Sequence, residues 1–233
     1  MHKSFHAKKT EQNGIVRRCH MQVTKNDIYS GCLIASISHA IMTNVYPELS
    51  YEQSWDGANY SIQNSSGMRG TITFENDFCV GAIRNEMSTS IVGGESIQEC
   101  MRNFPQKVVC KAYEETLQYL LMEKKGIVAP YVTSVFWADC NTLHYEEKYI
   151  DYIEVDFALL ENIVLSPKMA IKRWKEYYDM DSKVVELVDI LYQLKMKDFT
   201  SIIELKENQR KLIPGTCINS QCIEALKELN IIF

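Results

Sequence analysis

The sequence predicts an α+β fold with a helical C-terminal part, and three observations indicate this class. An apolar helix near residues 33–42 follows a segment, 15–24, in which apolar and polar residues alternate as in a half-buried strand. Short β-like runs recur at 127–137 and 149–157. From residue 166 onward, helix start and stop signals follow one another without a strand pattern between them.

A polar tail over residues 1–14 leads into the predicted strand 15–24, and turn residues then open a helix. The apolar positions of this helix recur every three to four residues, as an amphipathic helix requires, at Ile34, Ile37, Ile41 and Val45. Pro47 ends the helix. Residues 49–70 are rich in Ser, Asn, Gly and aromatic residues, so we expect an irregular segment there, either a surface loop or a lid.

The middle of the chain is predicted to alternate helices and strands. The apolar spacing predicts helices at 75–88, 95–103 and 113–124, and strands at 108–110, 127–137, 149–157 and 163–165. Gly126 supplies a stop for the last of these helices.

The C-terminal part is predicted to be all helical. Ser166 and Pro167 are a good N-cap and a proline at the first helical position. Helices are expected at 167–179, 182–196, 199–211 and 219–230. We therefore divide the chain into a tail (1–14), an α/β domain (15–165) and a helical extension (166–233) packed on the same core.

Composition limits the partners of this chain. Its 233 residues, 46% hydrophobic and 24% charged, suffice for one substantial core. The formal net charge of −5 argues against nucleic acid as the main partner. No apolar run approaches the roughly 20 residues that span a bilayer, and no hydrophobic segment follows the charged N-terminus as it does in a secretory signal. We expect a cytoplasmic protein without a membrane partner.

The eight cysteines lack the spacing of a zinc site or of a disulfide framework. Zinc sites use pairs of cysteines two to four residues apart, and only Cys217 and Cys222 approach that pattern. Disulfide frameworks belong to short secreted chains. Phosphate-binding loops and zinc-hydrolase motifs are absent from the sequence as well. We expect no metal and no cofactor, and most cysteines should be small buried hydrophobic residues.

One cysteine, Cys32, lies where a thiol becomes reactive. It is expected in the first turn of the apolar helix, where backbone N–H groups and the helix dipole favour the thiolate, the nucleophilic form. Tyr29, Gly31, Trp55 and Trp137 are candidate substrate-binding residues around it, although aromatic residues such as Trp55 and Trp137 are more often core or wall residues than ligand-stacking ones.

A cysteine nucleophile needs a base within about 3–4 Å and a group that orients the base. His39 is seven residues from Cys32 on one helix, which is about 10 Å and too far for proton transfer. His144, after the strand 127–137, is the candidate base, and its alternative role is that of a solvated loop histidine. Asp139 and Asp156 are candidates for the orienting carboxylate, and we favour Asp156 because a charge within an apolar strand needs a reason.

A family resemblance follows from these residues and from three phrases around them. Tyr29 and Cys32 open the helix, and Leu49-Ser50-Tyr51-Glu52, Trp55-Asp56-Gly57-Ala58 and Gly126-Ile127-Val128-Ala129-Pro130-Tyr131-Val132 follow. This layout resembles the N-terminal domain of butirosin-biosynthesis-type acyltransferases, which are related to papain-like and C39-like peptidases, over roughly residues 27–157. The resemblance implies a papain-like fold in which the cysteine helix packs on a small antiparallel sheet.

The resemblance also implies a reaction, in which a cysteine takes an acyl group from a carrier-protein thioester and passes it to a small-molecule amine. We expect Cys32 as the nucleophile, His144 as its base and Asp156 as the orienting group. The backbone N–H of Cys32 should help to form the oxyanion hole, and an acidic acyl carrier protein should dock on the basic residues of 168–175. The alternative is a non-enzymatic acidic binding protein, an immunity protein or regulator, or a pseudoenzyme on the same fold; a homodimer is possible in either case.

Overall fold

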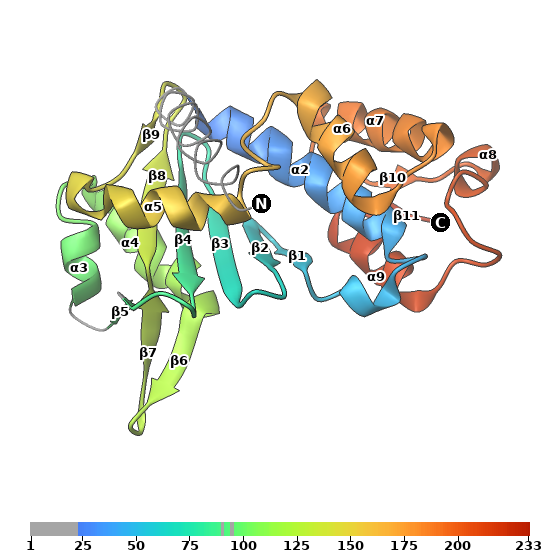
Figure 1. Ribbon diagram of the computed structural model, residues 1–233. Coiled ribbons are helices and arrows are strands. Elements are labelled where there is room, and N and C mark those ends of the chain that lie inside the picture. The colour runs from blue at the N-terminus through green and yellow to red at the C-terminus, as the bar shows by residue number, and fades with distance from the viewer. Residues whose placement is uncertain (1–22, 90, 94–95) are drawn as a thin grey trace, which may run out of the picture. The chain divides into compact units, whose positions relative to one another are not determined.

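The structure is a computed structural model that describes residues 23–89, 91–93 and 96–233, and Figure 1 shows its elements. The predicted tail 1–14 and most of the predicted strand 15–24 lie outside the described residues. The described chain is a mixed α+β protein, as the sequence predicts. It divides into two compact units: residues 23–26 with 65–160 form the first, and 27–64 with 161–233 form the second.

The first unit is built on an antiparallel sheet. Its strands, in spatial order, are β3 (Met68–Phe74), β4 (Cys79–Asn85), β8 (Ser134–Ala138) and β9 (Leu143–His144). β4 is buried along its whole length, which makes it the centre of this sheet. Gly81 is required there, because the ring of Phe136 on β8 lies 2.2 Å from the position that a Cβ would take.

Helices cover both faces of this sheet (Figure 1). One face of β4, with Val80 and Ala82, packs on a core formed by α3 (Ile97–Cys100), α4 (Gln106–Glu114) and the 3₁₀ helix η3 (Thr116–Leu120). Tyr149 of η4 (Glu147–Tyr149) packs against the same core. The other face receives α5 (Ile150–Asp156) and η5 (Phe157–Leu159), where Phe136 meets Phe157 edge to face.

A β-ribbon follows η3. β6 (Leu121–Lys124) and β7 (Ile127–Val132) form a hairpin, and β5 (Val92–Gly93) pairs with the far end of β7. Lys125 and Gly126 both have positive φ, 54° and 79°, as a two-residue type I′ turn requires. Gly126 therefore closes a hairpin instead of ending a helix, so the prediction of one helix over 113–124 was wrong.

Several other predictions in this unit were wrong for one reason: short apolar runs fit a helix and a strand equally well. The predicted helix 75–88 is mainly β4, the predicted strand 108–110 lies inside α4, and 149–157 is helical instead of extended. In α5 the buried positions are Ile153 and Asp156, three apart, with Phe157 just beyond, so the period is helical. In the second unit, the predicted strand 163–165 is also wrong, because these residues form turns and bends.

The second unit surrounds the helix α2 (Lys25–Met42), which is buried at almost every position from Ile28 onward. Its other elements follow in chain order: η1 (Pro47–Leu49), β1 (Gln53–Asp56), β2 (Asn59–Gln63), α6 (Pro167–Tyr178), α7 (Ser182–Lys197), β10 (Ile203–Glu204), α8 (Glu207–Arg210), α9 (Ser220–Glu228) and β11 (Ile231–Ile232). The predicted helices over 167–179, 182–196 and 219–230 are confirmed.

Two predictions in the second unit were wrong. Residues 49–70 are not irregular, because β1 and β2 form an antiparallel hairpin in which Trp55 pairs with Tyr60. The predicted helix 199–211 is helical only in α8, and β10 pairs with β11 in parallel. Among the described residues, no helix combines the length and the apolar composition needed to cross a membrane.

Candidate functional site

Cys32 lies deep within α2 and not at its start. The helix begins at Lys25, so Cys32 is its eighth residue, two turns from the N-terminus, and its side chain has no exposed surface. The expectation of a first-turn cysteine is therefore wrong, because Asn26 and Asp27 are themselves helical. The N-terminal dipole effect is confined to the first turn and does not act at this position.

The helix also uses the backbone groups of Cys32. In an α-helix the N–H of each interior residue donates to the carbonyl four residues earlier, here that of Ile28. The carbonyl of Cys32 in turn accepts the hydroxyl of Ser36 at 2.8 Å. The N–H that we expected in an oxyanion hole is thus committed within the helix.

Aromatic rings gather near this part of α2. Tyr29, Trp55 and Phe199 contact one another with centroid distances of 5.1–6.3 Å, and the indole N–H of Trp55 donates to Ser36 Oγ at 2.6 Å. Burial raises the pKa of the Tyr29 phenol, and the proximity of Cys32 raises it further. Four of the predicted site residues, Tyr29, Gly31, Cys32 and Trp55, therefore belong to one region of the second unit.

Gly31 has a packing reason to be glycine. A Cβ at this position would lie 1.8 Å from the carbonyl oxygen of Ile163. The helix and the segment after residue 160 approach each other more closely here than any side chain permits, which accounts for the glycine without a substrate.

His39 is a buried histidine within the second unit. Its Nδ1 lies 2.9 Å from the hydroxyl of Tyr178. Burial lowers its pKa to about 4, although the backbone of Ser50 acts in the opposite direction. His39 is thus a neutral, buried imidazole that Tyr178 holds in place.

His144 lies in the first unit, on β9. It pairs across the sheet with Trp137 on β8, and the two rings stack in parallel at a centroid distance of 3.9 Å. Its Nε2 lies 3.3 Å from Oδ2 of Asp139. Trp137 and His144, both predicted site residues, are thus in direct contact.

Asp139 is held by the turn between β8 and β9. Its Oδ1 accepts the backbone N–H groups of Asn141 and Thr142 at 2.7 and 2.9 Å. Burial alone raises the pKa of this carboxyl, but these N–H donors and His144 outweigh it, so the pKa lies below its ordinary value. Asp139 therefore stays ionised and fixes the imidazole of His144.

Asp156 has different partners. It lies on α5, where the hydroxyls of Thr133 and Ser134 donate to its Oδ2, the latter at 2.7 Å. Burial raises its pKa, against these hydrogen bonds. The carboxylate beside His144 is Asp139, which corrects the preference for Asp156 as the orienting group.

An open pocket of about 530 Å³ adjoins the stacked pair in the first unit. Its apolar wall consists of Phe104, Trp137, His144 and Tyr145, and Asn103 and residues 146–148 complete it. Phe104 meets Trp137 edge to face at 6.4 Å.

Among the residues that the structure describes, the charges at this pocket are mostly negative and lack a cationic partner. Glu146 accepts only uncharged donors, the backbone N–H and the side-chain amide of Asn103, at 2.7 and 3.0 Å. Glu147 is exposed, and its side chain has no partner within the described part of the chain. The cation of the pocket, Lys148, pairs with Glu99 at 3.2 Å. The sequence could have indicated this cluster, since Glu146 and Glu147 follow the histidine that it singled out.

The predicted site residues thus divide between the units. Tyr29, Gly31, Cys32 and Trp55 lie in the second unit, and Trp137, His144 and Asp156 lie in the first. Within the described residues, no three His, Cys, Asp or Glu side chains are grouped as a metal site requires. Comparisons of the chain with protein-family models, curated proteins and solved structures give no match.

Proposed function

We propose that the chain is a binding protein whose first unit takes an organic cation, an amine or a guanidinium, in the pocket beside Trp137 and His144. The observation that carries this proposal is the combination of a ring-lined wall with carboxylates that have no cationic partner in the described part of the chain. The proposal is a chemical form of the non-enzymatic alternative, an acidic binding protein.

Aromatic rings and carboxylates recognise such a ligand by complementary means. The face of an aromatic ring carries negative charge and attracts a cation within about 6 Å, an effect of about 0.5–1 kcal/mol at exposed sites. Phe104 and Tyr145 supply such rings beside the stacked pair of Trp137 and His144. Glu146 and Glu147 add Coulomb attraction that salt screens. Lys148 does not cancel them, because Glu99 already neutralises it. The ligand would therefore bind weakly and with strong salt dependence.

Calorimetry and tryptophan fluorescence test this proposal with two probes, spermidine and arginine amide, and with glutarate as the anionic comparison. We expect both cations to bind, to weaken as salt rises and to change the emission of Trp137, and we expect no binding of glutarate. Glu147→Gln, which removes one exposed charge, should weaken binding about threefold. Trp137→Phe should remove the fluorescence response.

The matched control is Glu123→Gln, an exposed carboxylate on β6 outside the pocket. It should leave the affinity for both cations unchanged. Equal affinity of the Glu147→Gln variant and the unsubstituted protein, or an equal effect of Glu123→Gln, would sink the proposal.

A second candidate function, cysteine-dependent acyl transfer on a papain-like fold, is favoured by one observation. The residues predicted around the nucleophile, Tyr29 and Trp55, do gather near Cys32. In this function an acyl group passes from an acyl carrier protein, docked on the basic residues of α6, to the Cys32 thiolate and then to a small-molecule amine.

Alkylation by iodoacetamide separates the two functions. A binding protein should leave Cys32 unmodified under native conditions, while the exposed Cys110, Cys140 and Cys217 react. An acyltransferase should instead show selective modification of Cys32 below pH 7. Peptide mass spectrometry across pH identifies the modified thiol.

A further inference from the structure

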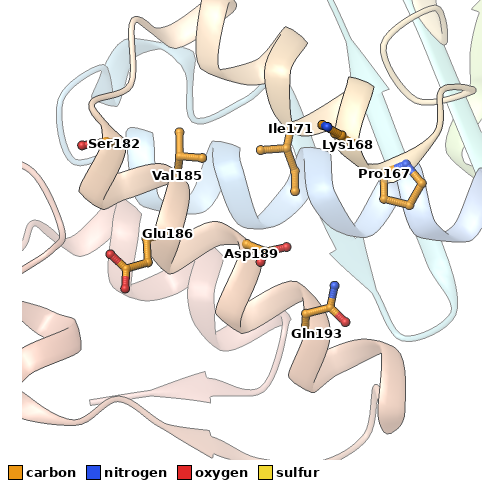
Figure 2. Close-up of a pocket in the computed structure, with 8 residues that line it drawn as sticks. All are labelled: Pro167, Lys168, Ile171, Ser182, Val185, Glu186, Asp189 and Gln193. Atoms are coloured by element: carbon orange, nitrogen blue, oxygen red, sulfur yellow. The ribbon is translucent and has the colours of Figure 1, made fainter.

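The helical hairpin of α6 and α7 carries an open groove of about 530 Å³ along its outer side (Figure 2). Its apolar floor is Ile171 from α6 and Val185 from α7, both half-buried. The two helices run antiparallel, because only residues 179–181 join them.

The two walls of this groove have opposite charge. Lys168 lines the groove on α6. Lys172 and Lys175 follow it at helical spacing along the same helix, and all three lysines are exposed. Glu186 and Asp189 are exposed on α7, one turn apart, and Figure 2 shows both beside the groove. The hairpin therefore presents a basic wall and an acidic wall with an apolar strip between them.

Most of these charges have no partner within the described chain. The side chains of Lys168, Lys175, Glu186 and Asp189 make no hydrogen bond or ion pair with any described residue. Lys172 makes only a long contact, 3.8 Å, with Glu176. The walls do not neutralise each other across the groove, so their charges remain available to another molecule.

We propose that a second copy of this chain docks on the groove, so that the basic α6 wall of each copy meets the acidic α7 wall of the other. A two-fold axis along the groove produces this pairing, because the rotation exchanges the sides on which the two walls lie. It places α6 of one copy antiparallel to α7 of the other, as in a four-helix bundle. The contact is isologous and closed, so it stops at a dimer.

The size of the face predicts a weak dimer. The 12 residues of α6 rise about 18 Å, and two helices packed at 8–10 Å present a face about 20 Å wide. The footprint of roughly 400 Å² per copy falls below that of standard stable interfaces. We therefore expect an association in the range of tens to hundreds of micromolar that salt weakens.

Sedimentation velocity of the full chain over a range of concentrations tests the proposal at 50 and 500 mM salt. The unsubstituted protein should form dimers at low salt, and its dissociation constant should rise at least tenfold at high salt. Lys168→Glu with Lys175→Glu makes both walls acidic, and Glu186→Lys with Asp189→Lys makes both basic. Each variant alone should be monomeric.

The decisive arm mixes the two charge-reversed variants. Every wall of one then meets an oppositely charged wall of the other, so the mixture should form heterodimers at least as tight as the original dimer. The mixing experiment measures a gain of association, so a misfolded variant cannot produce the expected result. Circular dichroism confirms that each variant is folded.

The matched control, Lys206→Glu with Lys227→Glu, makes the same change of charge at exposed positions outside α6 and α7. It should dimerise like the unsubstituted protein and should not pair with the basic variant. A monomeric unsubstituted protein at all salt concentrations, or no heterodimer in the mixture, would overturn the proposal. The proposal would also be overturned if the control variant paired with the basic variant as tightly as the acidic variant does. Cation binding in the first unit should persist in every variant, which separates this test from that of the proposed function.

Discussion

Cys32 illustrates at the scale of one residue how position within a helix decides what a thiol can do. A first-turn cysteine faces unpaired N–H groups, whereas the eighth residue of α2 faces a closed ladder of hydrogen bonds and neighbouring side chains. The side chain of Cys32 has no exposed surface, as is common for cysteines that pack as small apolar residues.

Acid should destabilise the protein through His39. Its pKa is about 4 in the folded chain and near 6.5 when exposed, so the unfolded state binds more protons between these values. This stabilisation is complete above pH 6.5 and is lost as the pH falls toward 4, by about 3 kcal/mol in the free energy of unfolding. Urea unfolding from pH 7 to 4.5 measures the loss.

His39→Gln should reduce this dependence on pH, because the substituted residue does not titrate. Ser38→Ala, a neighbouring buried substitution without a titrating group, should retain it. Identical pH dependence in the His39→Gln variant and the unsubstituted protein would contradict the assignment.

Gly31→Ala should lower the free energy of unfolding by about 2–4 kcal/mol, because the added Cβ would overlap the carbonyl of Ile163. In most helices, replacing glycine by alanine raises the free energy of unfolding. Here the backbone must move to relieve the overlap, so the substitution should lower it instead. Denaturant unfolding measures it. A stabilised variant would show that the two segments separate easily.

The sequence predicts His144 and Trp137 as site residues, but it does not predict that their rings stack. Their stacking depends on the register of β8 against β9, which the β8–β9 turn sets and which composition does not encode. Asp156 was singled out because a buried charge needs partners, and it has them in Thr133 and Ser134. A buried carboxylate does have hydrogen-bond partners, but the sequence alone does not show which residues they are.

At the scale of elements, the helices α6 and α7 were predicted correctly because residues at their N-termini mark where each begins. α6 begins at Pro167, and α7 begins after Asp181, whose side chain accepts the N–H groups of Lys183 and Val184. Short apolar runs such as 79–85 and 108–110 carry no such signals. Their periods fit helix and strand equally well, and burial against neighbours decides between them.

The β6–β7 turn predicts a stabilising substitution. Lys125 adopts a φ of 54°, which costs a lysine more than an asparagine. Lys125→Asn creates the Asn-Gly pair that type I′ turns prefer and should raise the free energy of unfolding by about 0.5 kcal/mol, measured by thermal or urea unfolding.

The neighbouring Lys124→Asn is the comparison. Lys124 has no positive φ among the backbone angles recorded, and its ammonium lies 4.1 Å from the centre of the Tyr131 ring. This substitution should be neutral or destabilising. Equal effects at 124 and 125 would refute the argument from the turn.

At the scale of the whole molecule, the units do not follow the order of the chain. The second unit combines 27–64 with 161–233, so the C-terminal helices belong with α2. The sequence predicts a boundary near residue 165, because only helix start and stop signals follow it. It gave no sign that α2 lies on the far side of that boundary, because long-range partnership leaves no local pattern.

Cysteine labelling during urea unfolding should report these units. Cys32 and Cys222 are buried in the second unit, and Cys79 and Cys100 are buried in the first. Burial raises the pKa of Cys79 and Cys222 to about 12, so neither reacts until it is exposed. We expect Cys32 to become reactive at the same urea concentration as Cys222, 190 positions away in the chain.

Pulsed alkylation with mass spectrometry gives a midpoint for each thiol. Different midpoints for Cys32 and Cys222 would show that the second unit does not unfold as one. A shared midpoint for Cys79 and Cys100 is the corresponding expectation in the first unit, and the exposed Cys140 should react without urea.

The burial of α2 has a consequence for how a cell makes this protein. The helix, with Ile34, Ile37 and Ile41 among its apolar residues, leaves the ribosome before its partners α6 to α9, which begin only after residue 160. At ~5–20 residues per second, translation of the roughly 120 residues between them takes ~6–24 s. During that time the apolar helix α2 lacks these partners, so newly made protein should depend on a chaperone that covers α2 until α6 to α9 have emerged.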